Sequence, residues 1–256
     1  MRTALLASVS ALAFATSAVA ADLAPAYKAP PPVPVLPTWA GFYLGIQGGL
    51  AQNYTTWTDL DALITGANSN NLAKTGGIFG GYAGYNWQDR SLVLGVETDG
   101  HWVGAKASQT LFAGLPGFNT AAENGEVRWV GSFRGRAGLD FESTLFYLTG
   151  GVAYGGVRDN VTWINGAFSG FPPGSTRASF NLDQTRVGWT AGAGIEHLFS
   201  GSNWTARAEV RYTDLGSTTV NCTNGTFTCS GGGFGTYRAN FTNTLWTGVV
   251  GIGYKF

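Results

Sequence analysis

Hydrophobic and polar positions alternate with a period near two from Trp39 onwards, and a helical period does not recur. In LVLGVETDGHW, residues 92–102, apolar side chains oppose positions that include Glu97 and Asp99. In VRWVGSFRGRAGLDF, residues 127–141, Val127 and Phe133 share the apolar face, whereas Arg128 shares the other face with further arginines. Such alternation predicts strands with one apolar and one polar face. We expect eight of them, near Ala40–Gln52, Gly76–Gln88, Ser91–Ala107, Glu126–Phe141, Thr144–Val157, Thr185–Phe199, Asn203–Leu215 and Asn243–Phe256.

The connections between these strands alternate in length. Asp89-Arg90, Glu142-Ser143 and the residues around Gly201 are short, whereas the others are long: Asn53–Thr75, Ser108–Gly125, Arg158–Gln184 and Gly216–Thr242. Bacterial outer-membrane barrels have short turns at the periplasmic end and long loops at the outer end. The pattern predicts an all-β fold, an eight-stranded antiparallel up-and-down transmembrane β-barrel.

A soluble barrel that binds a ligand is the alternative, and it would turn its apolar face inward. Aromatic residues decide against it, because a belt of them is typical of a membrane interface. Backbone groups in lipid must all be paired, so the sheet is expected to close. The aromatic residues expected near the short-turn end are Trp39, Phe42, Tyr85, Trp87, Phe141, Phe146, Phe199, Trp204, Tyr254 and Phe256.

The polar faces then point into a lumen that eight strands leave just wide enough for side chains to fill. A buried charge costs several kcal/mol unless it is paired. An equal set of acids and arginines suits a self-neutralising network, because the planar guanidinium binds carboxylates bidentately. A water-lined pathway for small ions is the alternative, which Tyr43, Gln47, Tyr82, Asn86 and Tyr147 would narrow. The expected network consists of Glu97, Asp99, Arg134, Arg136, Glu196, Arg207, Glu209 and Arg211.

Composition agrees with a strand-rich membrane protein. Charged residues make up 12% of the chain, about half the globular average, and there are 39 glycines. The charges balance, 15 basic against 15 acidic, so a nucleic-acid partner is not expected. Gly192-Ala193-Gly194 is a fragment of a dinucleotide fingerprint without its third glycine or a following helix, so we expect no cofactor.

The N-terminal region predicts export. Arg2 precedes an apolar stretch, and Ala18-Val19-Ala20 is a small-x-small cleavage site, so residues 1–20 are expected to be a signal peptide. A membrane anchor is less favoured because serine and threonine interrupt the short stretch. Residues 21–38 are rich in proline and suit an extended periplasmic spacer. The barrel is expected to occupy residues 39–256.

Cys222 and Cys229 are the only cysteines, and they flank a turn sequence in the last long connection. Two thiols without a nearby histidine are too few for a closed zinc site, which has four ligands. In an exported chain they are expected to form a disulfide in this loop.

Several stretches resemble a known family: WAGFYLGIQGGL, GGIFGGYAGYNWQ, LVLGVETD, GWTAGAGIEHLFSGSNWTARAEVRYTDLG and VGIGYKF. They are similar to the small outer-membrane β-barrels of α-proteobacteria, the immunogenic porin-family proteins related to OmpA-type barrels. The resemblance implies residence in the bacterial outer membrane, surface-exposed loops, and contact with outer-membrane lipid and lipopolysaccharide. It also implies assembly by the barrel-insertion machinery, with Tyr254 and Phe256 as a C-terminal assembly signal. His197 departs from the pattern, in which tyrosine is more common.

We expect a structural and surface-exposed role with at most a narrow pore. A porin-like channel for small hydrophilic solutes or ions is the alternative. An enzyme is not expected, because His101 and His197 lie near opposite strand ends and no Ser-His-acid set is recognisable. Long loops on a rigid scaffold often carry binding functions, but the sequence of these loops contains no motif that identifies a ligand.

Overall fold

The computed structural model describes residues 38–60, 69–111, 120–167, 172–221 and 238–256. The expected signal peptide and nearly all of the expected proline-rich segment lie outside these residues. Among the described residues, no helix is long and apolar enough to cross a bilayer.

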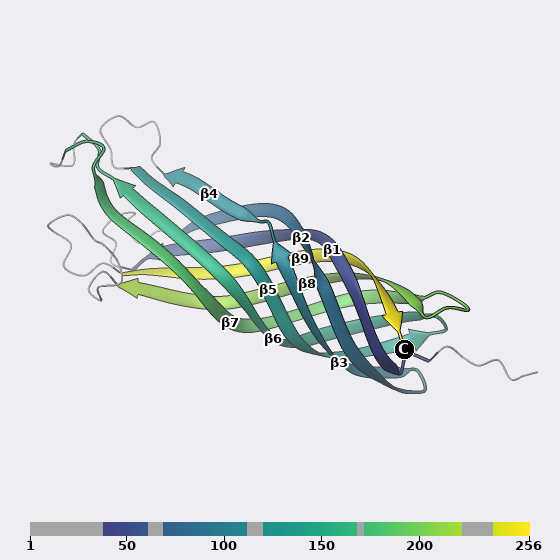
Figure 1. The fold of residues 1–256 in the computed structure, drawn as a ribbon. Coiled ribbons are helices and arrows are strands. Elements are labelled where there is room, and N and C mark those ends of the chain that lie inside the picture. The colour runs from purple at the N-terminus through teal and green to yellow at the C-terminus, as the bar shows by residue number, and fades with distance from the viewer. Residues whose placement is uncertain (1–37, 61–68, 112–119, 168–171, 222–237) are drawn as a thin grey trace, which may run out of the picture. The chain divides into compact units, whose positions relative to one another are not determined.

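The described chain is a single antiparallel sheet that closes on itself (Figure 1). Around the sheet the order is β3-β2-β1-β9-β8-β7-β6-β5-β4, and pairing of β3 with β5 completes the ring. β3 and β4 follow each other along the chain and pair with successive parts of β5. They therefore count as one interrupted strand, and the nine segments form eight barrel strands. The predicted eight-stranded barrel is therefore confirmed. The segments are β1 (Gly41–Asp59), β2 (Ser69–Asp89), β3 (Leu92–Val103), β4 (Lys106–Leu111), β5 (Thr120–Phe141), β6 (Thr144–Ile164), β7 (Thr176–Leu198), β8 (Trp204–Asn221) and β9 (Arg238–Lys255).

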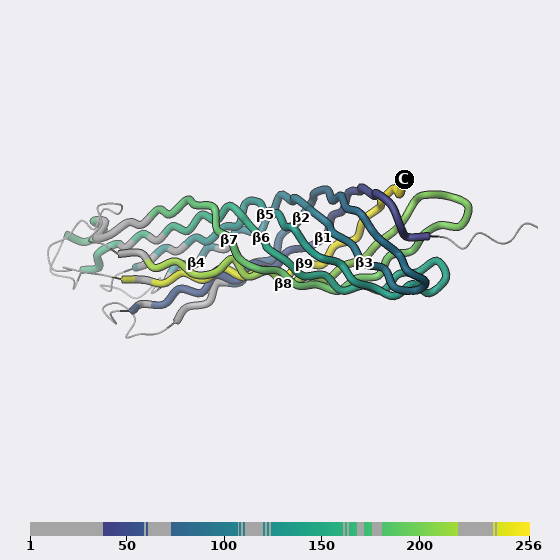
Figure 2. The backbone as a smooth tube through the Cα atoms, turned by 90° about the horizontal axis from the view of Figure 1, so that it is seen from below, coloured from purple at the N-terminus to yellow at the C-terminus, as the bar shows by residue number. Residues whose placement is uncertain are grey.

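The three short connections lie at one end of the barrel, beside the C-terminus (Figure 2). Two of them turn at non-glycine residues with positive φ, Arg90 at 54° and Glu142 at 61°. The third contains Gly201, whose φ of 73° suits a residue without a Cβ atom. Tight turns at this end hold neighbouring strands in register.

The strands reach much further toward the opposite end than the sequence pattern predicts. β1 continues from the expected end at Gln52 to Asp59, and β7 begins at Thr176 instead of Thr185. Much of each expected long loop is therefore strand, and that part of the prediction is wrong. The physical reason is that these extensions lie beyond the apolar band. Their outward positions are polar, so the alternation that identifies a membrane strand is lost while the hydrogen-bonded ladder continues.

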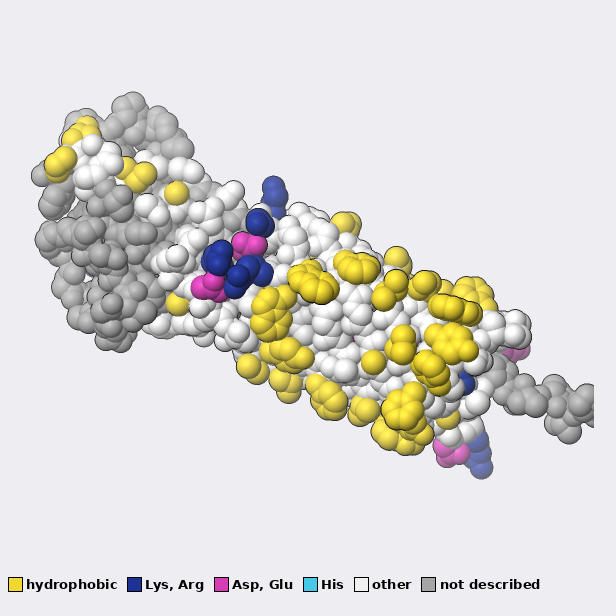
Figure 3. All heavy atoms as spheres, viewed as in Figure 1, with side chains coloured by type: hydrophobic (Ala, Val, Ile, Leu, Met, Phe, Trp, Pro, Cys, Tyr) yellow, Lys and Arg dark blue, Asp and Glu magenta, His cyan; other side chains and the backbone are white. Residues whose placement is uncertain are grey.

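The outer wall carries the apolar faces. Figure 3 shows hydrophobic side chains gathered over the barrel wall, with charged side chains bordering them on the side away from the short turns. Exposed residues include Leu148 at 67%, Val187 at 68% and Val250 at 66%. An apolar surface this extensive requires a hydrocarbon surrounding.

Aromatic residues form a girdle at each edge of this wall. At the short-turn end, the rings of Trp204 and Tyr254 contact each other, as do those of Tyr254 and Phe256. At the opposite edge, Trp129 contacts Tyr154. Trp189, Tyr212 and Trp246 continue that outer girdle. The prediction that Trp39 belongs to the inner girdle is wrong, because this residue is 1% exposed and lies inside the barrel.

A β-bulge in β5 changes the faces expected for two residues. The register with β6 passes from Val127 opposite Val157 to Trp129 opposite Gly156, which leaves Arg128 without a partner residue in the ladder. Because the extra residue shifts the alternation, Val127 points inward and is fully buried, whereas Arg128 points outward. The prediction for these two positions is wrong, since an uninterrupted period of two cannot reveal a bulge.

Candidate functional site in the barrel interior

The strongest concentration of charge lies inside the barrel. The structure places all eight residues of the expected network on inward positions of β3, β5, β7 and β8, and none is more than 5% exposed. Strand alternation explains this arrangement, because Glu97 and Asp99 are two apart on β3 and Arg134 and Arg136 are two apart on β5. The register sets Glu97 opposite Arg134, so acid meets base across one ladder.

Arg134 connects three carboxylates. It pairs with Glu97, with Asp99 at 2.9 Å and with Glu209 at 2.7 Å. Arg134 and Glu209 come from β5 and β8, which are separated by two strands around the barrel, so this pair crosses the lumen. The side chains of all four residues have no exposed surface.

The remaining members join the same network. Arg207 pairs with Glu97 at 2.8 Å and with Glu209 at 3.3 Å. Arg211 pairs with Asp99 at 2.8 Å and lies 3.4 Å from Glu209. Arg136 pairs with Glu196 and lies 3.9 Å from Glu97. Every charge therefore has an opposite charge within 4 Å, which is the condition that makes burial of so many ions tolerable.

Tyrosine rings fill the space around the guanidinium groups. Arg207 lies 3.6 Å from the centre of the Tyr82 ring, and Arg136 lies 3.8 Å from that of Tyr147. The Tyr147 hydroxyl donates to Glu209 over 3.0 Å. Gly194 makes room for this ring, since a Cβ atom there would overlap the phenol of Tyr147. The fragment Gly192–Gly194 is thus part of a packed strand.

His101 extends the network, a contact that the sequence analysis did not anticipate. The histidine is 3% exposed, with Nδ1 3.2 Å from an Asp99 oxygen and Nε2 2.6 Å from the Gln47 amide nitrogen. Ser132 donates to the second Asp99 oxygen over 2.6 Å, so the serine and the histidine contact the same carboxylate but the structure records no bond between them. This geometry differs from a Ser-His-acid triad, in which the histidine accepts the serine proton.

A largely apolar cluster, which we call the lid, lies inside the barrel at the short-turn end. Trp39, Val93, Leu145, Tyr147 and Leu198 form one buried cluster there. The Trp39 indole donates to Asp140 over 2.9 Å, and this bond helps to hold the buried ring in place. Trp39 precedes β1, so strand periodicity gave no information about its direction.

A second apolar layer lies on the other side of the charges. Along β3 the inward residues run from Val93 through Glu97 and Asp99 to His101 and Val103, so the layer begins one inward position beyond the histidine. Its members come from every strand of the barrel except β7, and none is more than 6% exposed. They are Ala51, Ile78, Val103, Ala105, Val127, Val130, Ala153, Val157, Leu215, Leu245 and Val249.

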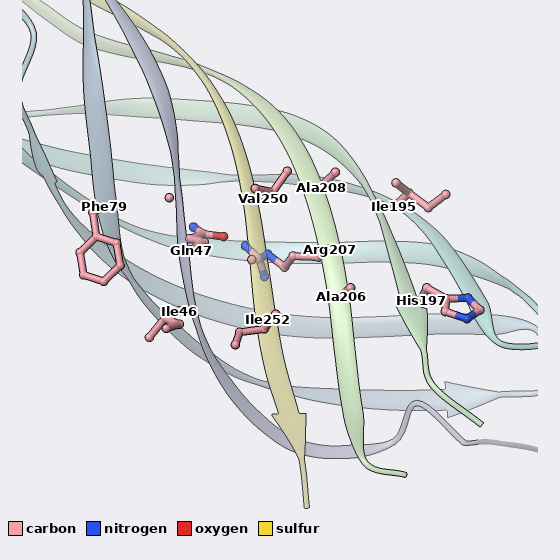
Figure 4. Close-up of a pocket in the computed structure, with 12 residues that line it drawn as sticks. Ile46, Gln47, Phe79, Ile195, His197, Ala206, Arg207, Ala208, Val250 and Ile252 are labelled. Carbon is pink, nitrogen blue, oxygen red and sulfur yellow. The ribbon is translucent and has the colours of Figure 1, made fainter. Parts of the chain in front are cut away.

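A shallow hollow also occurs on the outer wall (Figure 4). Its lining includes the small residues Gly48, Ala206 and Ala208 and larger apolar residues such as Ile46 and Ile252. Its outward lining suits a hydrocarbon chain of the bilayer. The polar groups Gln47 and Arg207 belong to the lumen, where both are buried.

Cys222 and Cys229 lie outside the described residues, so their disulfide stays a prediction. Tyr254 and Phe256 lie in the inner girdle, but their role in assembly stays a prediction too. Among the described side chains, no group of three or more His, Cys, Asp or Glu residues is arranged to hold a metal ion.

A closed antiparallel barrel with an apolar outer wall, two aromatic girdles and a charged interior defines a transmembrane β-barrel of the outer-membrane class. The chain belongs to the outer membrane protein beta-barrel domain family, whose model matches residues 3–256. It is therefore a protein of the bacterial outer membrane.

Curated relatives agree with this assignment. The chain is 36% identical over 266 residues to the 31 kDa outer-membrane immunogenic protein of Brucella melitensis biotype 1, with 100% of each chain covered. It is 31% identical over 232 residues to the 22 kDa outer membrane protein of Rhizobium leguminosarum bv. viciae, covering 88% of this chain and 82% of the relative. Among solved structures, OprG from Pseudomonas aeruginosa is 17% identical with a TM-score of 0.46, over 85% of this chain and 96% of that one.

Proposed function

We propose that this protein is a closed structural barrel that presents its loops at the cell surface and conducts at most small ions through a narrow path. The observation that carries the proposal is the apolar layer on top of the charge network. Aliphatic side chains in a constriction disfavour water and ions, because they offer nothing that replaces hydration. Thr247, between Val249 and Leu245 on β9, is a polar residue at this level. The lid that includes Trp39 adds a second barrier at the opposite end.

The alternative is a porin-like channel for small hydrophilic solutes. Charged rings line many channels, and the eight charges here are the observation in its favour. However, each guanidinium is held by carboxylates of the same network rather than aimed at free water. A side chain held this way fills the lumen, and an eight-stranded barrel has little width to spare.

Osmotic swelling of proteoliposomes tests the proposal. Vesicles that contain the purified barrel are placed in isosmotic sugars, with a sixteen-stranded porin as the positive control. The proposal expects no swelling above that of empty vesicles. Swelling at a rate that depends on sugar size, as in the porin control, would contradict it and favour the channel.

A surface-binding role for the loops rests on their position at the end opposite the short turns. The strand extensions reach beyond the outer girdle, so the described ends of the strands lie outside the apolar wall. An antibody raised against residues 222–237 tests this placement on intact cells. We expect labelling without permeabilisation, and labelling only after permeabilisation would contradict it.

A further inference from the structure

A row of alternating charges crosses four neighbouring strands on the outside of the barrel. In the register, Lys106 of β4 faces Glu126 of β5, Glu126 faces Arg158 of β6, and Arg158 faces Asp183 of β7. The Lys106 side chain is 72% exposed, and those of Arg158 and Asp183 are each 41% exposed. Two bases and two acids make this row neutral by itself.

The bulge in β5 adds a fifth charge. Because it turns Arg128 outward, one guanidinium nitrogen of that residue lies 2.6 Å from one Asp183 oxygen. The other Asp183 oxygen lies 2.6 Å from a guanidinium nitrogen of Arg158. We call these five residues, Lys106, Glu126, Arg128, Arg158 and Asp183, the outer charged cluster. Three bases against two acids give it one excess positive charge.

The position of the outer charged cluster indicates which part of the membrane it contacts. Arg128 immediately precedes Trp129, which contacts Tyr154 in the outer girdle. Figure 3 shows charged side chains directly beside the hydrophobic wall, on the side away from the short turns. Aromatic girdles lie at the level of the headgroups, so the cluster lies where the headgroups of the outer leaflet lie.

The chemistry of the cluster suits a phosphate group. Guanidinium groups bind phosphate oxygens through paired, charge-assisted hydrogen bonds, and two of them converge here on one carboxylate. The hydrogen bond from Arg158 lowers the pKa of Asp183, which keeps that carboxylate ionised and both arginines in place. The apolar wall beside the cluster offers acyl chains a surface that a soluble anion does not need.

We propose that the outer charged cluster binds a phosphate group of an outer-leaflet glycolipid, whose acyl chains lie against the wall next to Trp129 and Tyr154. Arg128 and Arg158 contact the phosphate, Lys106 adds attraction, and Asp183 positions the two arginines. This assignment does not depend on whether the lumen conducts.

The test measures the affinity of the purified, folded full chain in detergent micelles for fluorescently labelled, bisphosphorylated lipid A by anisotropy. Arg128→Gln/Arg158→Gln removes the proposed contacts. Arg90→Gln removes one exposed arginine at the opposite end of the barrel and is the matched control. Asp183→Asn removes the acid and leaves every base. Heat-modified gel mobility verifies that each variant is folded.

We expect the double variant to bind on the order of a hundredfold more weakly, since each of the two lost charge-assisted bonds is worth about tenfold. Arg90→Gln should bind like the original protein. Asp183→Asn should bind more weakly than the original but more tightly than the double variant, because it loses the carboxylate that positions the arginines and keeps both arginines. Dephosphorylated lipid A should bind all four proteins equally weakly.

Other outcomes overturn the proposal. An unchanged affinity in the double variant, or a loss that persists with dephosphorylated lipid, would rule out phosphate recognition at this cluster. Equal losses in Asp183→Asn and the double variant would mean that the cluster only ties strands together. Displacement of the lipid by millimolar inorganic phosphate at constant ionic strength would show that the site takes a free anion instead of a glycolipid.

Discussion

Arg134 and Glu209 are 75 positions apart in the chain, yet their side chains meet across the lumen at 2.7 Å and both are fully buried. The contact exists because inward-facing residues of two strands that are not neighbours reach each other across a narrow lumen. Arg134 also pairs with the acids of β3, so it connects these acids with Glu209 of β8.

Arg134→Leu should lower the stability of the barrel by about 3–5 kcal/mol, because it leaves buried carboxylates without their main partner. The control is Phe133→Leu, one residue earlier, where a 59% exposed ring is exchanged for another apolar side chain. Urea unfolding in lipid vesicles measures both free energies. A neutral Arg134→Leu would mean that the buried charges do not hold the barrel together.

Phe133→Arg should be costly for the opposite reason, because Phe133 lies on the lipid-facing wall. A charge near the midplane of the bilayer costs about 2–4 kcal/mol, whereas one near the interface costs about 0–1 kcal/mol. Thr185→Arg is the matched control, since Thr185 is exposed on β7 just beyond Val187. Equal free energies of unfolding for these two variants would remove the support for a membrane-embedded wall.

Phe256→Ala should reduce assembly in cells while leaving the refolded barrel nearly as stable as before. Phe42→Ala is the control, because Phe42 is 66% exposed in the same girdle and Phe256 is 67% exposed. The measurement is the fraction of heat-modifiable protein in purified outer membranes. If both variants assemble equally well, Phe256 is only a girdle residue and carries no assembly signal.

Cys222 and Cys229 are predicted to form a disulfide in the last outer loop. The closed loop is short, so the bond should stabilise the protein by no more than about 2–3 kcal/mol. Alkylation of protein from unreduced cells, followed by mass spectrometry, detects the bond directly. Recovery of two alkylated thiols per chain would show that the prediction is wrong.

The eight network residues could be predicted from sequence because a strand alternates strictly. Once Phe133 is assigned to lipid, Arg134 and Arg136 must point inward, and the same reasoning places Glu97 and Asp99. The equal number of acids and arginines then predicts a paired interior. Pairing partners could not be predicted, because they depend on register and on which strands face each other across the lumen.

Three features escaped the sequence analysis for identifiable reasons. The bulge at Arg128 interrupts the alternation without any mark in the composition. The outer extensions of the strands have no apolar face, so they resemble loops. The apolar layer is built from single aliphatic residues of many strands, such as Val130 and Leu245, which come together only when the barrel closes.

Single-channel recording in planar bilayers tests the central claim of a closed lumen most directly. The purified barrel is compared with a sixteen-stranded porin and with a Val103→Ser/Val130→Ser variant, which makes the apolar layer polar. We predict no steps, or only small and brief ones, for the original protein and more frequent steps for the variant. Large, stable steps from the original protein, comparable to those of the porin, would contradict the closed lumen.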